Sequence, residues 1–237
     1  MTATGPQIIG ARRFTGDTGA VDPTLRAALH SFAKRTATDR DVLAVLGGVR
    51  LLIPVVALAS ETETDANGRT REKRSDVALP IMVGADGRRG VLAFTCVDAM
   101  QRWRRDARPV PAYVEEACQA ALDEGADALV IDVAGPVTYA VEDYFLRAFA
   151  QDGSVPEAKA DPQVLATIYR VTQAETDIDR VRVLDSDRAD LGVRLELHRR
   201  DDAMVRRIAE ELRGHLRPML PSGVELSAVV RAQADQG

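Results

Sequence analysis

The sequence contains few of the residues that build metal sites, disulfide frameworks and nucleic-acid surfaces. Its 237 residues include two cysteines and three histidines, and aromatic residues make up 4% of the chain. Two cysteines do not make a disulfide framework, and the histidines are too scattered for a zinc site. The net charge of −5 and the scarcity of stacking rings argue against a nucleic-acid surface. We therefore expect no metal, no cofactor and no nucleic-acid partner.

The sequence also lacks a long apolar run. A membrane-spanning helix needs about 18 or more apolar residues in succession, whereas the longest run, Leu51–Ala59, is short and contains Pro54. Met1–Gly19 has two arginines but no apolar core of the signal-peptide type. These absences predict a cytoplasmic protein without a membrane partner. Three lysines stand against 28 arginines, a bias typical of a GC-rich bacterial genome.

What remains is the composition of an ordinary globular protein, 46% apolar and 28% charged. A chain of this length can form two domains. Alternating or short apolar segments predict strands, and a 3.6-residue apolar period predicts helices. We predict an α+β fold with two α/β-type domains, each a mixed sheet packed with helices. Apart from one helix that follows Thr95, the helices are expected at 23–35, 39–46, 113–124, 141–150, 162–172 and 203–216, and the strands at 49–58, 77–83, 90–94, 128–133, 137–140, 180–184, 192–198 and 224–230.

Changes in composition divide the chain into four segments. The linker contains Gly, Ser, Pro, Lys and Glu with few apolar residues, and apolar periodicity resumes after it. Within the first domain, Asn67-Gly68 predicts a turn in a solvated hairpin loop at 61–76. The second domain should follow the order helix, strand, strand, helix, strand, with both helices on one face of a three-stranded sheet. The segments are a flexible N-terminal arm at 1–20, a first domain at 21–150, the linker at 151–160 and a small second domain at 161–237.

The stretch Gly90–Pro109 runs from a buried strand into a helix. Thr95 occupies the position of an N-cap, and Asp98 follows at the spacing of a capping box. Apolar residues recur at helical spacing as far as Trp103, which we expect to be largely buried against the sheet, although tryptophan also anchors interfaces. The prolines of Pro109–Pro111 should break the chain before the next helix.

Two residues could carry chemistry. Cys96 would lie at the first turn of the helix, where the helix dipole favours a thiolate. A helix terminus contributes only about 0.3–1 kcal/mol and no histidine is placed to help, so a small structural residue is the favoured interpretation. Asp132 ends a strand beside Gly135 and could be a general base or a cation ligand, but it lacks a partner carboxylate. Hydrogen bonding within its own turn is favoured for Asp132, and core packing for Cys118.

Charged residues suggest two surfaces. Arg105 lies in a run of arginines between residues 102 and 108, which is more typical of a solvated face than of an anion site. Arg194, Glu196 and His198 alternate with apolar residues along one predicted strand. Because two helices cover only one face of a small sheet, this charged face should meet water, the N-terminal domain or a second copy of the chain. We expect a monomer or a weak, salt-sensitive homodimer, and this face is a better candidate for a partner surface than any pocket.

A series of short motifs resembles the SseB family, bacterial proteins named for enhanced serine sensitivity. The motifs span residues 23–150, which resemble the family's N-terminal domain, and residues 181–230 resemble its C-terminal domain more weakly. Ala93, Cys96 and Val133 depart from the proline, serine and proline that are usual in the family. The resemblance implies no established enzymatic activity. In chain order the motifs are Leu52 to Val56, Leu79-Pro80, Asp86-Gly87-Arg88, Ala93 to Cys96, Trp103, Arg108 to Pro111, Ile131-Asp132 and Ala134-Gly135-Pro136.

Three functional hypotheses follow. The favoured one is a non-catalytic cytoplasmic module for protein interaction or regulation, with an unknown protein partner, and not an enzyme. The alternatives are a thiol-linked modulator of sulfur-transfer chemistry that uses Cys96, and an enzyme with a composite site near Thr95 and Asp132. We predict no catalytic, cofactor-binding or metal-binding residue. The candidate functional surface consists of Thr95, Cys96, Arg105, Asp132, Arg194, Glu196 and His198.

Overall fold

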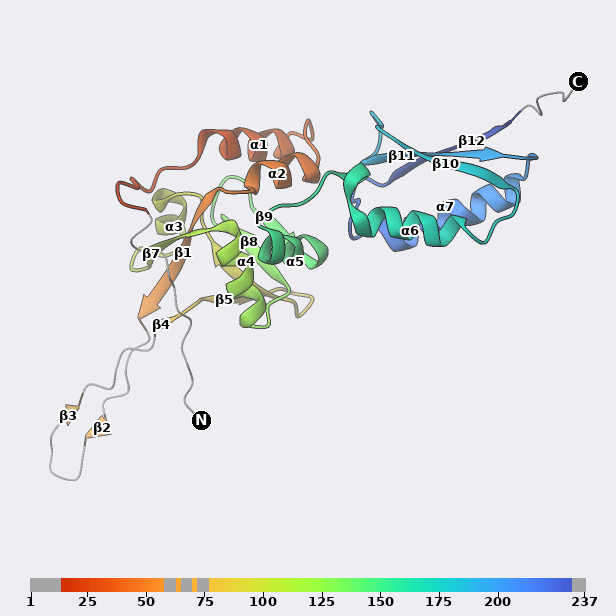
Figure 1. Ribbon diagram of the computed structural model, residues 1–237. Coiled ribbons are helices and arrows are strands. Elements are labelled where there is room, and N and C mark those ends of the chain that lie inside the picture. Colours follow the sequence, from red (N-terminus) through yellow and green to blue (C-terminus); the bar gives the residue numbers. More distant parts are fainter. Residues whose placement is uncertain (1–13, 58–62, 65–69, 72–76, 232–237) are drawn as a thin grey trace, which may run out of the picture. The chain divides into compact units, whose positions relative to one another are not determined.

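The computed structural model describes residues 14–57, 63–64, 70–71 and 77–231 (Figure 1). The chain separates into two compact units, the first made of residues 1–37 and 41–155 and the second of residues 38–40 and 156–237. Both units combine helices with sheets, and each contains parallel as well as antiparallel strand pairs. The α+β prediction is confirmed.

A four-stranded sheet forms the centre of the N-terminal unit. Its two central strands are parallel, and each outer strand is antiparallel to its neighbour. The central strands are buried along almost their whole length, which indicates that both faces of the sheet are covered. The strand order is β5 (Ile81–Val83), β6 (Arg89–Ala93), β8 (Ala128–Ile131) and β9 (Tyr139–Glu142).

Alternate residues of the central strands enter two apolar clusters on opposite faces of this sheet. Val91 and Leu129 belong to the larger cluster, and Leu92 and Val130 belong to the smaller one. The smaller cluster also contains the buried residues of α3 (Val97–Trp103). α3 therefore lies across the sheet from the larger cluster. Four helices contribute to that larger cluster, namely α1 (Pro23–Ala33), α2 (Asp39–Leu46), α4 (Val114–Asp123) and α5 (Asp143–Asp152).

Leu52 and Phe94 join the central sheet to a second, antiparallel sheet. The N–H of each residue donates to the carbonyl of the other at 2.8 Å. Phe94 is fully buried, and its ring centroid lies 5.6 Å from that of Trp103. Trp103 itself is partly buried and packs on the smaller cluster, which includes residues of the central sheet. The second sheet has the order β4 (Val77–Ala78), β1 (Arg50–Ala57) and β7 (Arg108–Tyr113).

Two predictions at prolines are wrong, a break of the chain at Pro109–Pro111 and a continuous strand through Pro80. Pro109 and Pro111 lie inside β7 and do not break the chain. β7 is an edge strand, and residues two apart direct their nitrogens to the same side, so both missing N–H groups can face away from β1. The strand predicted at 77–83 is divided at Pro80 into β4 and β5, which belong to different sheets.

Local signals place other elements correctly. Pro23 opens α1, and the Asp22 carboxylate accepts hydrogen bonds from the N–H groups of Thr24 at 2.8 Å and Leu25 at 3.0 Å. In the loop predicted at 61–76, β2 (Glu63–Thr64) pairs with β3 (Thr70–Arg71). The predicted turn at Asn67-Gly68 lies outside the described residues.

The described part of the predicted N-terminal arm, residues 14–20, is attached to the rest of the N-terminal unit. The Arg50 guanidinium donates to Asp17 Oδ1 at 2.8 Å, to the Ala20 carbonyl at 2.6 Å and to the Thr95 carbonyl at 3.0 Å. The Gly19 carbonyl accepts from the N–H of Val97 at 3.0 Å. Arg50 and Gly19 therefore attach this segment to the residues that begin α3.

Gly19→Ala is expected to lower the free energy of unfolding of the N-terminal unit by about 2–3 kcal/mol. A Cβ at Gly19 would lie 2.4 Å from Val97 Cγ2, and its φ of +72° is strained for alanine. Gly16→Ala is the matched control, because φ there is +93° but no atom lies within 4 Å of the added Cβ. Urea unfolding of both variants checks this; equal losses would mean that the contact with α3 contributes nothing.

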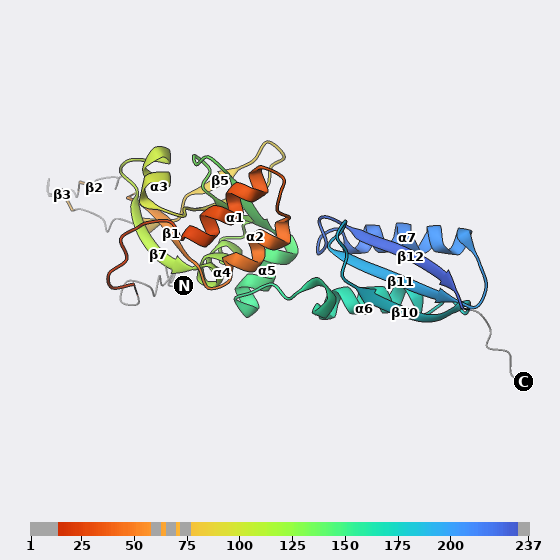
Figure 2. The same ribbon diagram turned by 90° about the horizontal axis from the view of Figure 1, so that it is seen from above.

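The C-terminal unit is a three-stranded sheet with two helices on one face (Figures 1 and 2). β10 and β11 are antiparallel, β11 and β12 are parallel, and β11 is central. Part of the predicted linker is helical, since α5 continues to Asp152 and residues 158–160 form a 3-10 turn. In chain order the elements are α6 (Pro162–Thr172), β10 (Ile178–Leu184), β11 (Leu191–Leu197), α7 (Asp202–Leu216) and β12 (Val224–Val230).

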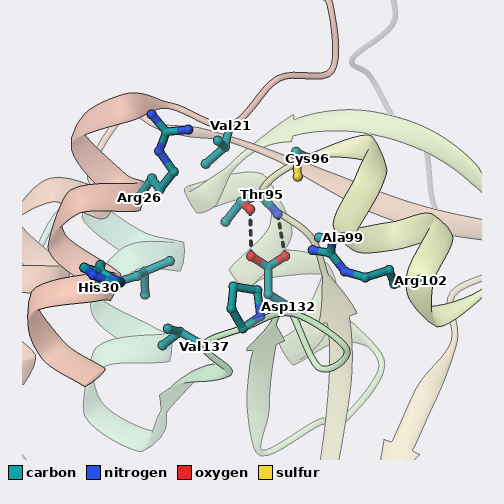
Figure 3. Close-up of a pocket in the computed structure, with 11 residues that line it drawn as sticks. Val21, Arg26, His30, Thr95, Cys96, Ala99, Arg102, Asp132 and Val137 are labelled. Atoms are coloured by element: carbon teal, nitrogen blue, oxygen red, sulfur yellow. Dashed lines mark hydrogen bonds between the residues drawn. The ribbon is translucent and has the colours of Figure 1, made fainter. Parts of the chain in front are cut away.

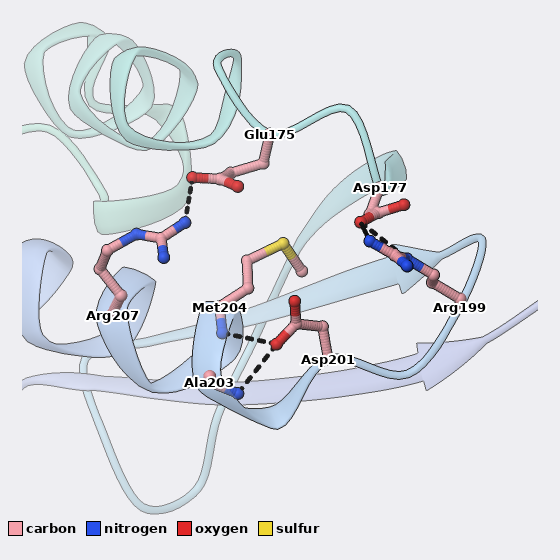
Figure 4. Close-up of polar contacts among 7 residues, drawn as sticks. All are labelled: Glu175, Asp177, Arg199, Asp201, Ala203, Met204 and Arg207. Carbon is pink, nitrogen blue, oxygen red and sulfur yellow. Dashed lines mark hydrogen bonds and ion pairs between the residues drawn. The ribbon is translucent and has the colours of Figure 1, made fainter.

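Charged contacts fix the connections of the C-terminal unit (Figure 4). The Asp201 carboxylate accepts from the N–H groups of the first turn of α7, Ala203 at 3.0 Å and Met204 at 2.9 Å. The Arg199 guanidinium donates twice to Asp177 Oδ2, at 3.0 and 2.9 Å. The contact between Arg199 and Asp177 ties the loop between β11 and α7 to the loop that precedes β10.

Candidate functional site

Thr95 and Asp132 meet at one edge of the central sheet. β6 and β8 are parallel and Ala93 pairs with Ile131, so the residues that follow the two strands emerge side by side. Asp132 Oδ1 accepts from the backbone N–H of Thr95 at 2.9 Å, and Oδ2 accepts from its hydroxyl at 2.6 Å (Figure 3). Thr95 is 4% and Asp132 5% exposed. The pair therefore forms a buried, two-point connection between strand ends.

The predicted N-cap role of Thr95 is wrong. The N-cap of α3 is Cys96, and its side chain makes no capping hydrogen bond. Among the described residues, Asp98 does not form a capping box with it. Thr95 instead directs both its N–H and its hydroxyl to Asp132, a residue 37 positions away. The first N–H of α3, that of Val97, donates to the Gly19 carbonyl.

A tight turn presents the Asp132 carboxylate to Thr95. Asp132 has a φ of +54°, in the left-handed region that aspartate tolerates better than most residues. Its carbonyl accepts from the N–H of Gly135 at 2.7 Å and from the Thr138 hydroxyl at 3.2 Å. A Cβ at Gly135 would lie 2.8 Å from Asp132 Cβ, so glycine is required there. The predicted turn bond exists, but it is made by the backbone of Asp132 and not by its side chain.

Burial raises the pKa of the Asp132 carboxyl above its ordinary value, and the two Thr95 hydrogen bonds and the charge of Arg102 oppose that rise. Arg102 extends from α3 toward the carboxylate (Figure 3), and its Nε donates to the Ala134 carbonyl at 3.4 Å. The carboxylate is held by one threonine at both oxygens. This geometry suits a structural connection better than a mobile proton carrier.

A pocket of about 170 Å³ lies beside this pair, between α1 and α3. Arg26, Leu29 and His30 line it from one face of α1, as their i, i+3, i+4 spacing requires. The prediction from sequence missed Arg26 and His30, because they are ordinary polar positions at the border of an amphipathic helix. The full lining is Val21, Arg26, Leu29, His30, Thr95, Cys96, Ala99, Arg102, Asp132, Pro136 and Val137.

The two cysteines occupy different environments. Cys96 is half-buried and lines the pocket. Cys118 lies in α4, is completely buried in the larger apolar cluster, and burial raises the pKa of its thiol to about 12. The prediction that Cys118 is a core residue is confirmed.

Iodoacetamide is therefore expected to label only Cys96 in the native protein, at pH 8 and without denaturant. Cys118 should be labelled only after unfolding, because its thiol is neither accessible nor ionised in the native state. Mass spectrometry of tryptic peptides measures both sites. Labelling of Cys118 at the rate of Cys96 in native buffer would show that the α4 core opens readily.

The structure divides the predicted surface residues into two groups. Thr95, Cys96 and Asp132 come together at the pocket. Arg105 is exposed beyond the end of α3 and does not line that pocket. The C-terminal group lies in the other unit: Arg194 and Glu196 on β11, and His198 just after it, where its N–H donates to the Asp177 carbonyl at 2.9 Å.

The described residues offer neither a metal site nor a membrane-spanning helix, and they leave no buried polar side-chain atom unpaired. No group of three or more His, Cys, Asp or Glu side chains in that part of the chain could hold a metal ion. Every buried side-chain nitrogen or oxygen there has a hydrogen-bond partner. None of the helices it contains is long and apolar enough to cross a membrane.

The fold and the site define an α+β protein whose first unit joins two parallel strand ends through a threonine–aspartate pair. A family model described as SseB protein N-terminal domain matches residues 25–148, more than half of the chain. The chain belongs to the SseB family, and the resemblance noted from its motifs is confirmed. The match includes Thr95 and Asp132 and ends before residue 156, where the larger segment of the second unit begins. No curated protein and no solved structure matched the chain.

Proposed function

We propose that this protein is a non-catalytic cytoplasmic module for protein interaction or regulation, and that it binds a protein partner through the open face of its C-terminal sheet. One observation carries the proposal. The inner face of β11 is fully buried against the helices, with Val193, Leu195 and Leu197 at most 2% exposed, while Arg194 on the outer face is exposed. A folded unit that keeps a charged sheet face uncovered offers a flat surface for a partner.

The outer face is rich in arginine. Arg182 of β10 is paired in register with Arg194, and Arg180 with Glu196. Arg182 makes an ion pair with Glu196, whereas Arg194 has no ion pair within the part of the chain that the structure describes. Across β12 the face continues with Ser227 beside Arg194. Its unpaired positive charge at the centre favours an acidic partner surface.

The Thr95–Asp132 pair supports the non-catalytic part of the proposal. An acid–base catalyst needs a carboxyl that can exchange its proton with a substrate, whereas each oxygen of Asp132 accepts a hydrogen bond from Thr95, which holds the carboxyl in a structural contact. The chain's net charge of −5 disfavours tight self-association, because like-charged copies repel each other. The proposal fits a monomer or a weak dimer. Sedimentation should show that any such dimer dissociates in high salt.

Arg194→Glu is expected to weaken partner binding at least tenfold, because it reverses the central charge of the face. Arg206→Glu is the matched control: Arg206 is exposed on α7, on the other side of the same sheet. Capture from the native cells with both variants and the parent, at low and high salt, is the test. The proposal is refuted if Arg194→Glu captures the partner as well as the parent does, or if Arg206→Glu weakens capture as much as Arg194→Glu does.

A further inference from the structure

The pocket beside the Thr95–Asp132 pair has the position of a ligand site and room for a small molecule. It lies outside the C-terminal ends of two parallel strands, where open α/β sheets bind small molecules. Its walls come from α1, which belongs to the larger apolar cluster, and α3, which belongs to the smaller one. The volume of about 170 Å³ compares with roughly 30 Å³ for a water molecule in the liquid, so a molecule of several heavy atoms fits.

The lining combines apolar walls with cationic groups. Val21, Leu29, Ala99 and Val137 provide apolar contact surface. Arg26 and Arg102 line the pocket from its two helices. Arg102 extends toward the Thr95–Asp132 pair, whereas the guanidinium of Arg26 is directed away from that pair (Figure 3). His30 lies one turn after Arg26 on the same face of α1. Within the described residues, Arg26 has no ion-pair partner, and the described hydrogen bond of Arg102 goes to the Ala134 carbonyl.

The single acidic group in the described lining does not cancel this positive charge. Asp132 is 5% exposed, and each of its oxygens accepts a hydrogen bond from Thr95. Arg102 therefore supplies a permanent positive charge beside this buried, hydrogen-bonded carboxyl, and Arg26 adds a second positive charge on the α1 side of the pocket. An anion with an apolar body can use both the charge and the walls, whereas a compact, strongly hydrated anion such as phosphate can use only the charge.

We propose that this pocket binds a small organic carboxylate, with the apolar body between Leu29 and Val137 and the carboxylate group at Arg102. The site lies in the N-terminal unit and is independent of the charged face of the C-terminal sheet. Arg102 is the main anchor, because its side chain extends from α3 toward the Thr95–Asp132 pair (Figure 3).

Benzoate and butyrate are suitable probes, with benzamide and butyramide as uncharged analogues of the same shape and inorganic phosphate as the compact anion. Titration of the full chain, followed by two-dimensional amide NMR, should show saturable shifts at residues around the pocket with benzoate or butyrate. The amides and phosphate should bind at least tenfold more weakly, as expected when one charge-assisted hydrogen bond or the apolar contact is lost.

Two substitutions locate the site. Arg102→Gln should weaken benzoate binding at least tenfold, and Val137→Phe, which fills the pocket from a half-buried position, should abolish it. Arg105→Gln, just beyond the same helix, should change the affinity less than twofold. The proposal is overturned if no carboxylate gives saturable shifts, if benzamide or phosphate binds as tightly as benzoate, or if Arg105→Gln weakens binding as much as Arg102→Gln. Should Val137→Phe not fold, Arg102→Gln decides.

Discussion

Asp132→Ala should destabilise the N-terminal unit by about 3–5 kcal/mol. The change leaves the buried N–H and hydroxyl of Thr95 without the acceptors that now lie 2.9 and 2.6 Å away. It also places alanine at a φ of +54°, which costs roughly a further 1 kcal/mol. Urea unfolding followed by the fluorescence of Trp103 measures the loss, because the single tryptophan reports on the N-terminal unit.

Asp132→Asn is the matched control. Asparagine tolerates the left-handed backbone and can exchange two hydrogen bonds with Thr95, so the expected loss is under about 1.5 kcal/mol. A loss as large as that of alanine would show that the negative charge, and not the hydrogen-bonded connection, stabilises the strand ends. A loss near zero for both variants would mean that the pair is dispensable for folding.

The contribution of Asp132 to stability should depend on pH, and the Asp132→Asn variant reveals it. Burial raises the native pKa of Asp132 above 3.8, so between 3.8 and that raised value the native state binds more protons than the unfolded state. The contribution of Asp132 to the free energy of unfolding therefore falls as pH rises through this window. Asparagine does not titrate, so the variant lacks this pH dependence. The free energy of unfolding of the wild type minus that of Asp132→Asn should therefore decline as the pH rises from about 4. A rising difference would contradict the direction of the shift.

Phe94→Ala should cost the N-terminal unit about 3–5 kcal/mol, as for other fully buried aromatic residues. Phe94 is 0% exposed, its backbone joins the two sheets through Leu52, and its ring contacts Trp103. Removing the ring leaves a cavity in the smaller apolar cluster, which has few residues to close it. Urea unfolding gives the loss, and the emission of Trp103 should shift to longer wavelength in the native variant.

Phe94→Leu keeps most of the apolar volume and should cost only about 1–2 kcal/mol. The comparison separates the filling of the cluster from the contact between the rings, since leucine preserves the former and removes the latter. Equal stability of parent and Phe94→Ala would show that the smaller cluster does not hold α3 on the sheet.

The sequence predicts those elements whose signals are local. Asp22 and Pro23 mark the start of α1 because a carboxylate before a proline satisfies the first N–H groups of a helix. The α+β class and the outward position of Arg194 on β11 follow from periodicity alone. Pro109 misleads because local rules treat proline as a breaker, whereas an edge strand can accommodate it.

The candidate site depends on contacts between distant residues. Thr95 carries the side chain of a helix cap, and only the parallel pairing of β6 with β8 brings Asp132, 37 residues later, close enough to bind it. Arg26 and His30 could not be assigned to a pocket, because helical periodicity gives the face they share but not the neighbour of that face.

Photocrosslinking from the outer sheet face tests the proposed function most directly. A photoreactive residue at Ser227 leaves Arg194 intact and lies beside it on β12, while the same residue at Arg206 lies on the helical side. We expect the protein partner to crosslink from Ser227 at low salt, to be lost at high salt, and not to crosslink from Arg206. Crosslinking from Arg206 with none from Ser227 would contradict binding through the charged sheet face.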